Sequence, residues 1–109
     1  MSSLSTHVLD TMHGCPAEGV AVMLLSGESV VYEGRTDADG RCRDLPLLEP
    51  GLYVIEFAVA AYFRGKSVML PEPPFLDLVP IAFGIAEMGG HYHVPLLVSP
   101  YGYSTYRGS

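Results

Sequence analysis

Residues 91–109 read HYHVPLLVSPYGYSTYRGS, and the first part of this stretch, residues 91–98, is an apolar run typical of a β-strand. The second part carries Tyr101, Tyr103 and Tyr106, whereas terminal segments commonly become polar and disordered. We therefore expect residues 99–109 to pack against the molecule.

Further short segments precede this stretch, each ended by turn residues. The strands that we expect are residues 4–9, 19–25, 29–36, 51–57 and 76–85. Residues 51–57 (GLYVIEF) alternate well between two faces, and the Asp-Ala-Asp-Gly stretch at 37–40 is a strong turn signal. The Ala-rich residues 58–64, stopped by Gly65, form the one plausible helix. This pattern predicts one domain over residues 1–109, all-β with one short helix, in which two antiparallel sheets form a β-sandwich.

The composition narrows the classes of partner. The chain has 109 residues, 49% of them hydrophobic, and a formal net charge of −6. Its six basic residues do not cluster in the sequence, so we expect neither a nucleic-acid nor a membrane partner. Residues 1–10 lack the basic and apolar regions of a secretory signal. We expect a cytoplasmic protein in which Cys15 and Cys42 are free thiols.

Three histidines are the main candidates for chemistry. His91 and His93 flank Tyr92, so in a strand their side chains project from one face. His7 lies on the same face of its strand as Ser5 and Leu9, where a core or an interface is expected. The residues alone leave three readings open for these histidines: an ordinary polar face, a catalytic pair, or a zinc site.

The remaining polar residues point to no chemistry when taken singly. Asp37-x-Asp39-Gly40 has only the beginning of a calcium loop and is interpreted as a turn, and an arginine after a turn, such as Arg41, is exposed by default. Neither cysteine has the setting of a Cys–His nucleophile, and no G-x-S-x-G elbow surrounds a serine.

Several segments together resemble the 5-hydroxyisourate hydrolases, relatives of transthyretin. The segments that carry the resemblance are LSTHVLD at 4–10 with G-x-PA at 14–17, TD-x-DGR at 36–41, and the whole stretch 91–109. The terminal YRGS at 106–109 is similar to the element that separates these enzymes from transthyretin itself. Residues 59–84 are only loosely similar, which leaves the shape of that region open.

The resemblance implies a fold and an assembly. The fold is a transthyretin-like sandwich of two four-stranded antiparallel sheets, and the assembly is a homotetramer built as a dimer of dimers. The active sites lie in the channel between dimers.

The resemblance also implies a reaction and its residues. The reaction is hydrolysis of 5-hydroxyisourate to 2-oxo-4-hydroxy-4-carboxy-5-ureidoimidazoline, with no cofactor and no metal. The catalytic residues are His7, Arg41, His93 and Ser109. Substrate contacts come from His7 and Arg41 and from the segment Tyr106, Arg107 and Gly108. His91 either supports His93 or faces the channel with it.

Two alternatives remain at this stage. One is a transthyretin-like carrier that binds an aromatic ligand in the channel. Such a carrier does not need proton-transfer groups there. The other is a zinc hydrolase using His7, His91 and His93.

Overall fold

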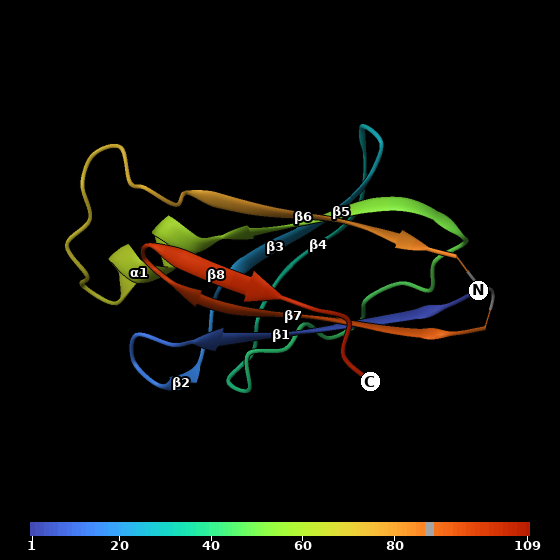
Figure 1. Ribbon diagram of the computed structural model, residues 1–109, viewed down its shortest axis with the longest axis horizontal. Helices are drawn as coiled ribbons and strands as arrows, with labels where there is room; N and C mark the ends of the chain where they lie inside the picture. The colour runs from blue at the N-terminus through green and yellow to red at the C-terminus, as the bar shows by residue number, and fades with distance from the viewer. Residues whose placement is uncertain (87–88) are drawn as a thin grey trace.

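The computed structural model describes residues 1–86 and 89–109, which form two four-stranded sheets packed face to face (Figure 1). One sheet has the strand order β2-β1-β7-β8 and the other β4-β3-β5-β6. The prediction of two four-stranded sheets and one short helix is confirmed. The elements are β1 (Ser3–Asp10), β2 (Cys15–Pro16), β3 (Ala21–Ser26), β4 (Ser29–Arg35), β5 (Gly51–Ala58), α1 (Val59–Gly65), β6 (Leu78–Ile85), β7 (His91–Ser99) and β8 (Gly102–Thr105).

The core lies between the two sheets and follows from the alternation of the strands. In β5 the side chains of Tyr53, Ile55 and Phe57 are buried while the residues between them are partly exposed. A strand with this period of two presents one apolar face, and a second sheet covers it. Helix α1 follows β5 directly and adds buried Tyr62 and Phe63 at one end of the sandwich.

The direction of one strand pair differs from the expectation. Strands β1 and β7 are parallel, with Ser3 opposite His91 and Asp10 opposite Val98, so the expectation of two purely antiparallel sheets is wrong for this pair. Parallel neighbours need a long connection between them, and here the intervening chain supplies it. The alternation of apolar and polar residues indicates which side chains lie on each face of a strand. It does not indicate whether the neighbouring strand is parallel or antiparallel, so the sequence pattern could not predict the parallel pairing of β1 with β7.

Two short strands lie where the sequence pattern indicates none. Residues 13–16 have the composition of a turn, yet Cys15 and Pro16 pair with the end of β1, and the expected tail contains β8, which pairs with β7. Pairing holds this segment in place as expected. However, the side chains of Tyr101, Tyr103 and Tyr106 are 62%, 46% and 60% exposed in the single chain.

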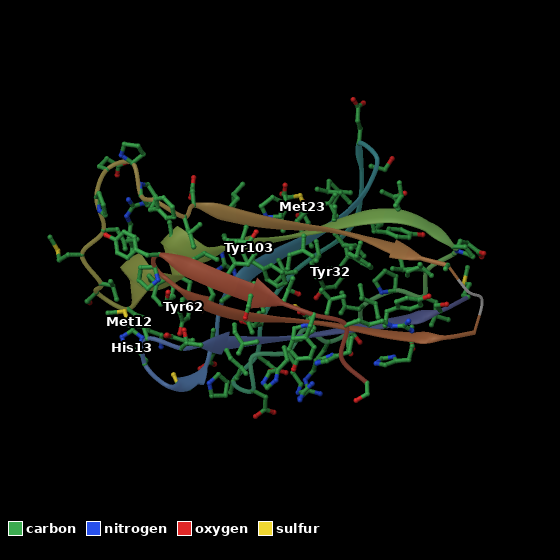
Figure 2. All side chains as sticks on the ribbon, in the orientation of Figure 1. Met12, His13, Met23, Tyr32, Tyr62 and Tyr103 are labelled. Atoms are coloured by element: carbon green, nitrogen blue, oxygen red, sulfur yellow. The ribbon has the colours of Figure 1, made fainter. Side chains whose placement is uncertain are left out.

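The end of β1 is attached to α1 through a buried carboxylate. Asp10, whose side chain is fully buried, accepts hydrogen bonds from the Tyr62 hydroxyl at 2.7 Å and from the backbone N–H of His13 at 2.9 Å. The His13 ring lies 2.6 Å from the same carboxylate, and Figure 2 shows His13 and Tyr62 together at this end of the molecule. Burial acts to raise the pKa of Asp10, but the bonds from His13 and Tyr62 outweigh it and hold the pKa below its usual value.

Two further features of the chain are its unpaired cysteines and its lack, among the described residues, of a membrane-spanning helix. Cys15 and Cys42 are both free thiols; the first is exposed and the second packs partly against the core. In the described part of the chain, no helix is long and apolar enough to cross a membrane.

Candidate active site

The outer face of the sheet β2-β1-β7-β8 gathers most of the residues singled out above. Along β1 the buried positions alternate with half-buried ones, which places Ser5 and His7 on the outer face. In β7 the pattern places His91 and His93 on that face, because Tyr92 between them is buried. The parallel register sets Ser5 opposite His93, so His7 and His93 are diagonal neighbours on one surface.

The turn at residues 37–40 brings Arg41 to His7. The Asp37 carboxylate accepts hydrogen bonds from the backbone N–H groups of Asp39 at 2.9 Å and Arg41 at 3.1 Å, which fixes the turn. Gly40 then accepts a bond from the N–H of Val8 at 2.8 Å, and His7 and Arg41 form an antiparallel bridge.

Gly40 is required at this position for two reasons. Its φ of +77° lies in the left-handed region, and a Cβ there would lie 2.4 Å from the carbonyl oxygen of Val8 and 3.3 Å from the His7 ring. The expected turn at residues 37–40 is therefore confirmed. It also places the Gly40 backbone in contact with the His7 ring and Arg41 on the same surface.

The segment after β8 closes on His93 in a similar way. Gly108 donates its N–H to the carbonyl of His93 at 2.8 Å, forming a second isolated bridge. A Cβ on Gly108 would lie 2.5 Å from Cδ2 of the His93 ring, so the backbone lies directly against the imidazole. Ser109 is exposed beyond this contact.

Two serines that the sequence reasoning did not single out bind the histidines of β7. The Ser5 hydroxyl lies 2.7 Å from Nδ1 of His93 and 3.0 Å from Nε2 of His91, and the Ser3 hydroxyl lies 2.6 Å from Nδ1 of His91. The spacing Ser3-x-Ser5-x-His7 was the available signal, because it puts three polar side chains on one face of a strand. This spacing does not indicate that β7 is the strand next to β1.

The surroundings of His93 favour its neutral form. Burial lowers the pKa of His93, and the positive charges of Arg41, His7 and His91 lower it further. A neutral imidazole has a free lone pair and can accept a proton from a water molecule. Arg41 supplies a fixed positive charge on the same face.

The structure does not bring every predicted site residue to this surface. The Arg107 guanidinium lies over the ring of buried Tyr92, 4.0 Å from its centre, and donates a hydrogen bond to the carbonyl of His91 at 3.3 Å. Tyr106 and Arg107 line a hollow of about 380 Å³ beside β6 and β8, together with Phe83. His7, Arg41, His93 and Gly108 are thus brought together, while Tyr106 and Arg107 lie at the edge of the sandwich.

In the described part of the chain the three histidines are not grouped as the ligands of one ion. In residues 1–86 and 89–109 no group of three or more His, Cys, Asp or Glu side chains is arranged to hold an ion. Both ring nitrogens of His91 and one of His93 already face serine hydroxyls. The zinc alternative therefore lacks the ligand set that it needs.

The two four-stranded sheets packed face to face place this protein in the transthyretin-like class of folds. Residues 4–108 match the model of the HIUase/Transthyretin family, and the chain belongs to that family. A 5-hydroxyisourate hydrolase of Pseudomonas aeruginosa is 49% identical over 118 residues, an alignment that covers 100% of this chain and 93% of the relative.

Solved structures agree with this placement. The 5-hydroxyisourate hydrolase of Klebsiella pneumoniae superposes with a TM-score of 0.88 at 37% identity and covers 100% of both chains. Sea bream transthyretin in complex with thyroxine superposes with a TM-score of 0.85 at 28% identity and covers 96% of this chain and 93% of its own. An (S)-allantoin synthase superposes with a TM-score of 0.92 at 43% identity, and there this chain spans 99% of its own length but 44% of the other.

Proposed function

We propose that this protein is a hydrolase that converts 5-hydroxyisourate to 2-oxo-4-hydroxy-4-carboxy-5-ureidoimidazoline. Family membership and the names of full-length relatives support the substrate. The observation that carries the proposal is that two backbone bridges, His7–Arg41 and His93–Gly108, assemble proton-transfer groups and a fixed cation on one surface. A carrier of an aromatic ligand has no use for such groups.

The substrate is a planar bicycle with an amide-like carbonyl in its six-membered ring. In the proposed mechanism His7 and His93 orient and deprotonate a water molecule, which attacks that carbonyl. General-base assistance of this kind contributes about 10²- to 10⁴-fold. The lowered pKa of His93 keeps its lone pair available near neutral pH.

Charge develops on the carbonyl oxygen as water adds. Arg41 faces the same surface as the two histidines, and its guanidinium stabilises that oxyanion. Gly108 lies against His93, and we propose that Gly108 and the following Ser109 contact the substrate or position the water. Tyr106 and Arg107 are proposed to contact the substrate from the sandwich edge. No step requires a redox cofactor, because the reaction adds water without oxidation.

We also propose that the protein works as a homotetramer, a dimer of dimers, in the cytoplasm. In the single chain the site is an open face, and a second copy across it would enclose a channel. Edge strands β6 and β8 carry exposed Leu78 and Tyr103, and unpaired strand edges are surfaces that a second chain can extend. The two free thiols support a reducing compartment.

The test is an absorbance time course on 5-hydroxyisourate made in the cuvette by urate oxidase. We expect the wild type to accelerate decay, a chelator to have no effect, and His7→Ala and His93→Ala each to lower the rate at least tenfold while the oligomer persists. Decay at the spontaneous rate with the wild type would overturn the proposal and favour ligand carriage, as in the transthyretin complexed with thyroxine.

A further inference from the structure

A continuous line of hydrogen-bonding groups runs along β1 and β7 away from His93. In order they are His93, Ser5, His91 and Ser3, joined by contacts of 2.7 Å, 3.0 Å and 2.6 Å. The parallel register produces this line, because Ser3 lies opposite His91 and Ser5 opposite His93. Residues two apart on one face of a strand are about 6.6 Å apart, a gap that one hydroxyl between two rings can span.

The single proton of the Ser5 hydroxyl couples the two rings. A hydroxyl donates one hydrogen bond, so Ser5 can donate to only one of the two ring nitrogens and must accept from the other. If it donates to Nε2 of His91, His93 carries its proton on Nδ1 and presents a lone pair at Nε2. If it donates to Nδ1 of His93, His93 carries its proton on Nε2 and presents a donor.

We propose that Ser5 and His91 are positioning residues that form a proton relay with His93, and that this relay holds the water proton on the exposed His91 ring between the two halves of the hydrolysis. The proposal rests on the proposed function and assigns to His91 a task that the resemblance left open. Neither residue needs to touch the substrate.

The proton balance is complete without a further reactant. Nε2 of His93 takes a proton from water as the oxygen bonds to the carbonyl carbon. Nδ1 of His93 passes its proton to Ser5, and the Ser5 hydroxyl proton moves to Nε2 of His91, which becomes an imidazolium. When the carbon–nitrogen bond breaks, the transfers reverse and Nε2 of His93 gives its proton to the leaving ring nitrogen.

The charges around His93 favour moving the proton from His93 to His91. Arg41 from the turn, His7 from β1 and His91 from β7 all face His93, and together with burial they disfavour a cation on its ring. His91 is exposed, so a cation there is solvated by water. The Arg107 guanidinium lies over the Tyr92 ring and donates its hydrogen bond to the backbone carbonyl of His91.

The first experiment follows the histidine ring nitrogens by NMR in the resting protein, without substrate. In the wild type we expect the two nitrogens that face Ser5, Nδ1 of His93 and Nε2 of His91, to have opposite roles, one carrying a proton and the other a lone pair. In Ser5→Ala this matched pair of tautomers should be lost, whereas Ser29→Ala, a change of an exposed serine at the start of β4, should preserve it. The same tautomers on both rings in the wild type and Ser5→Ala would overturn the relay.

The second experiment measures kcat and KM on 5-hydroxyisourate as a function of pH. Ser5→Ala and His91→Gln should each lower kcat about tenfold, a part of the general-base contribution, with little change in KM. Ser5→Thr, which keeps the hydroxyl, should retain most of the activity. The double variant should be no slower than Ser5→Ala alone, because residues that act as one unit are not additive.

The outcomes separate the two proposals. Wild-type turnover with an unchanged kcat in Ser5→Ala would overturn the relay and leave the hydrolase standing. Absence of wild-type turnover would overturn the hydrolase and with it the catalytic use of the relay. A Ser5→Thr variant as slow as Ser5→Ala would show that side-chain packing rather than the hydroxyl matters, which also overturns the relay.

Discussion

Gly108 shows how a residue without a side chain defines a site. Its backbone lies against the His93 ring. A Cβ added to Gly108 would clash with Cδ2, Cγ and Cβ of that histidine. Because these three atoms of His93 lie within 3.3 Å of the point that a Cβ would occupy, rotation of the ring alone does not relieve the clash. Gly40 has the corresponding place beside His7.

We therefore expect Gly108→Ala to displace His93 and to lower kcat on 5-hydroxyisourate at least tenfold, since small misplacements of a catalytic group are costly. The melting temperature should change little, because the substitution lies in an irregular segment and removes no core side chain. Gly65→Ala is the matched control: a Cβ there meets nothing within 4 Å. Full activity in Gly108→Ala would mean that the contact with His93 is not required.

The net charge of the chain does not indicate the sign of the charge around His93. The chain carries a formal charge of −6, yet the groups that influence His93 are Arg41, His7 and His91. The sequence places Arg41 just after an acidic turn, whose carboxylate is taken up by backbone N–H groups and by Arg43 at 3.0 Å. The outer face of this sheet thus carries the Arg41 cation on a protein that is acidic as a whole.

At the level of elements, the Asp10 carboxylate joins the end of β1 to helix α1. It receives two bonds from His13 and one from Tyr62, and these hydrogen bonds to a charged group are the stronger kind. The His13 side chain is 38% exposed and contacts this carboxylate. The sequence spacing could not reveal Tyr62 as the third partner, because it lies 52 positions away.

Asp10→Asn should lower the free energy of unfolding by about 2–3 kcal/mol at pH 7, the cost of removing the charge from these bonds. The folded-state pKa of Asp10 lies below its usual value, so its stabilisation is present above the usual carboxyl pKa and is lost as the pH falls through the folded value. The difference between wild type and variant should therefore shrink in acid. Urea titrations at fixed protein concentration measure it.

The control for this prediction is His13→Gln, which keeps the backbone N–H bond and the Tyr62 bond. It should cost clearly less than Asp10→Asn. A constant difference between wild type and Asp10→Asn from neutral to strongly acidic pH would contradict the assignment.

The elements differ in how far the sequence could predict them. Strand β5 and helix α1 are predicted within one residue, because alternation and an Ala-rich run are local signals. Strands β2 and β8 are not, since two- and four-residue strands are defined by their partners rather than by their own pattern. The pairing of Ser5 with His91 and His93 depends on a parallel register that no local pattern records.

At the scale of the whole molecule, the open face of the β2-β1-β7-β8 sheet is the surface that the proposed tetramer would cover. Besides its polar groups it carries Leu9 opposite Leu97, both half-buried in the single chain. A patch with apolar residues at one end and histidines at the other fits the wall of an enclosed channel.

Sedimentation velocity should give the mass of four chains of 11.8 kDa each. Leu97→Asp should convert the tetramer to a smaller species and lower activity, because it places a charge at a surface that assembly buries. Leu52→Asp, on the outer face of the other sheet at an 82% exposed position, should leave the tetramer intact. A monomeric wild type, or a tetrameric Leu97→Asp variant, would contradict the proposed assembly.

The parallel pairing of β1 with β7 also has a consequence for synthesis on the ribosome. Strands β3, β4, β5 and β6 pair only among themselves, so their sheet can form while the chain is still growing. Strand β1 is made first, but its partner β7 emerges some eighty residues later, and contacts so distant in sequence form slowly. A nascent or prematurely terminated chain that lacks β7 also lacks His93, so under the proposed function we expect activity to appear only at the last stage of folding.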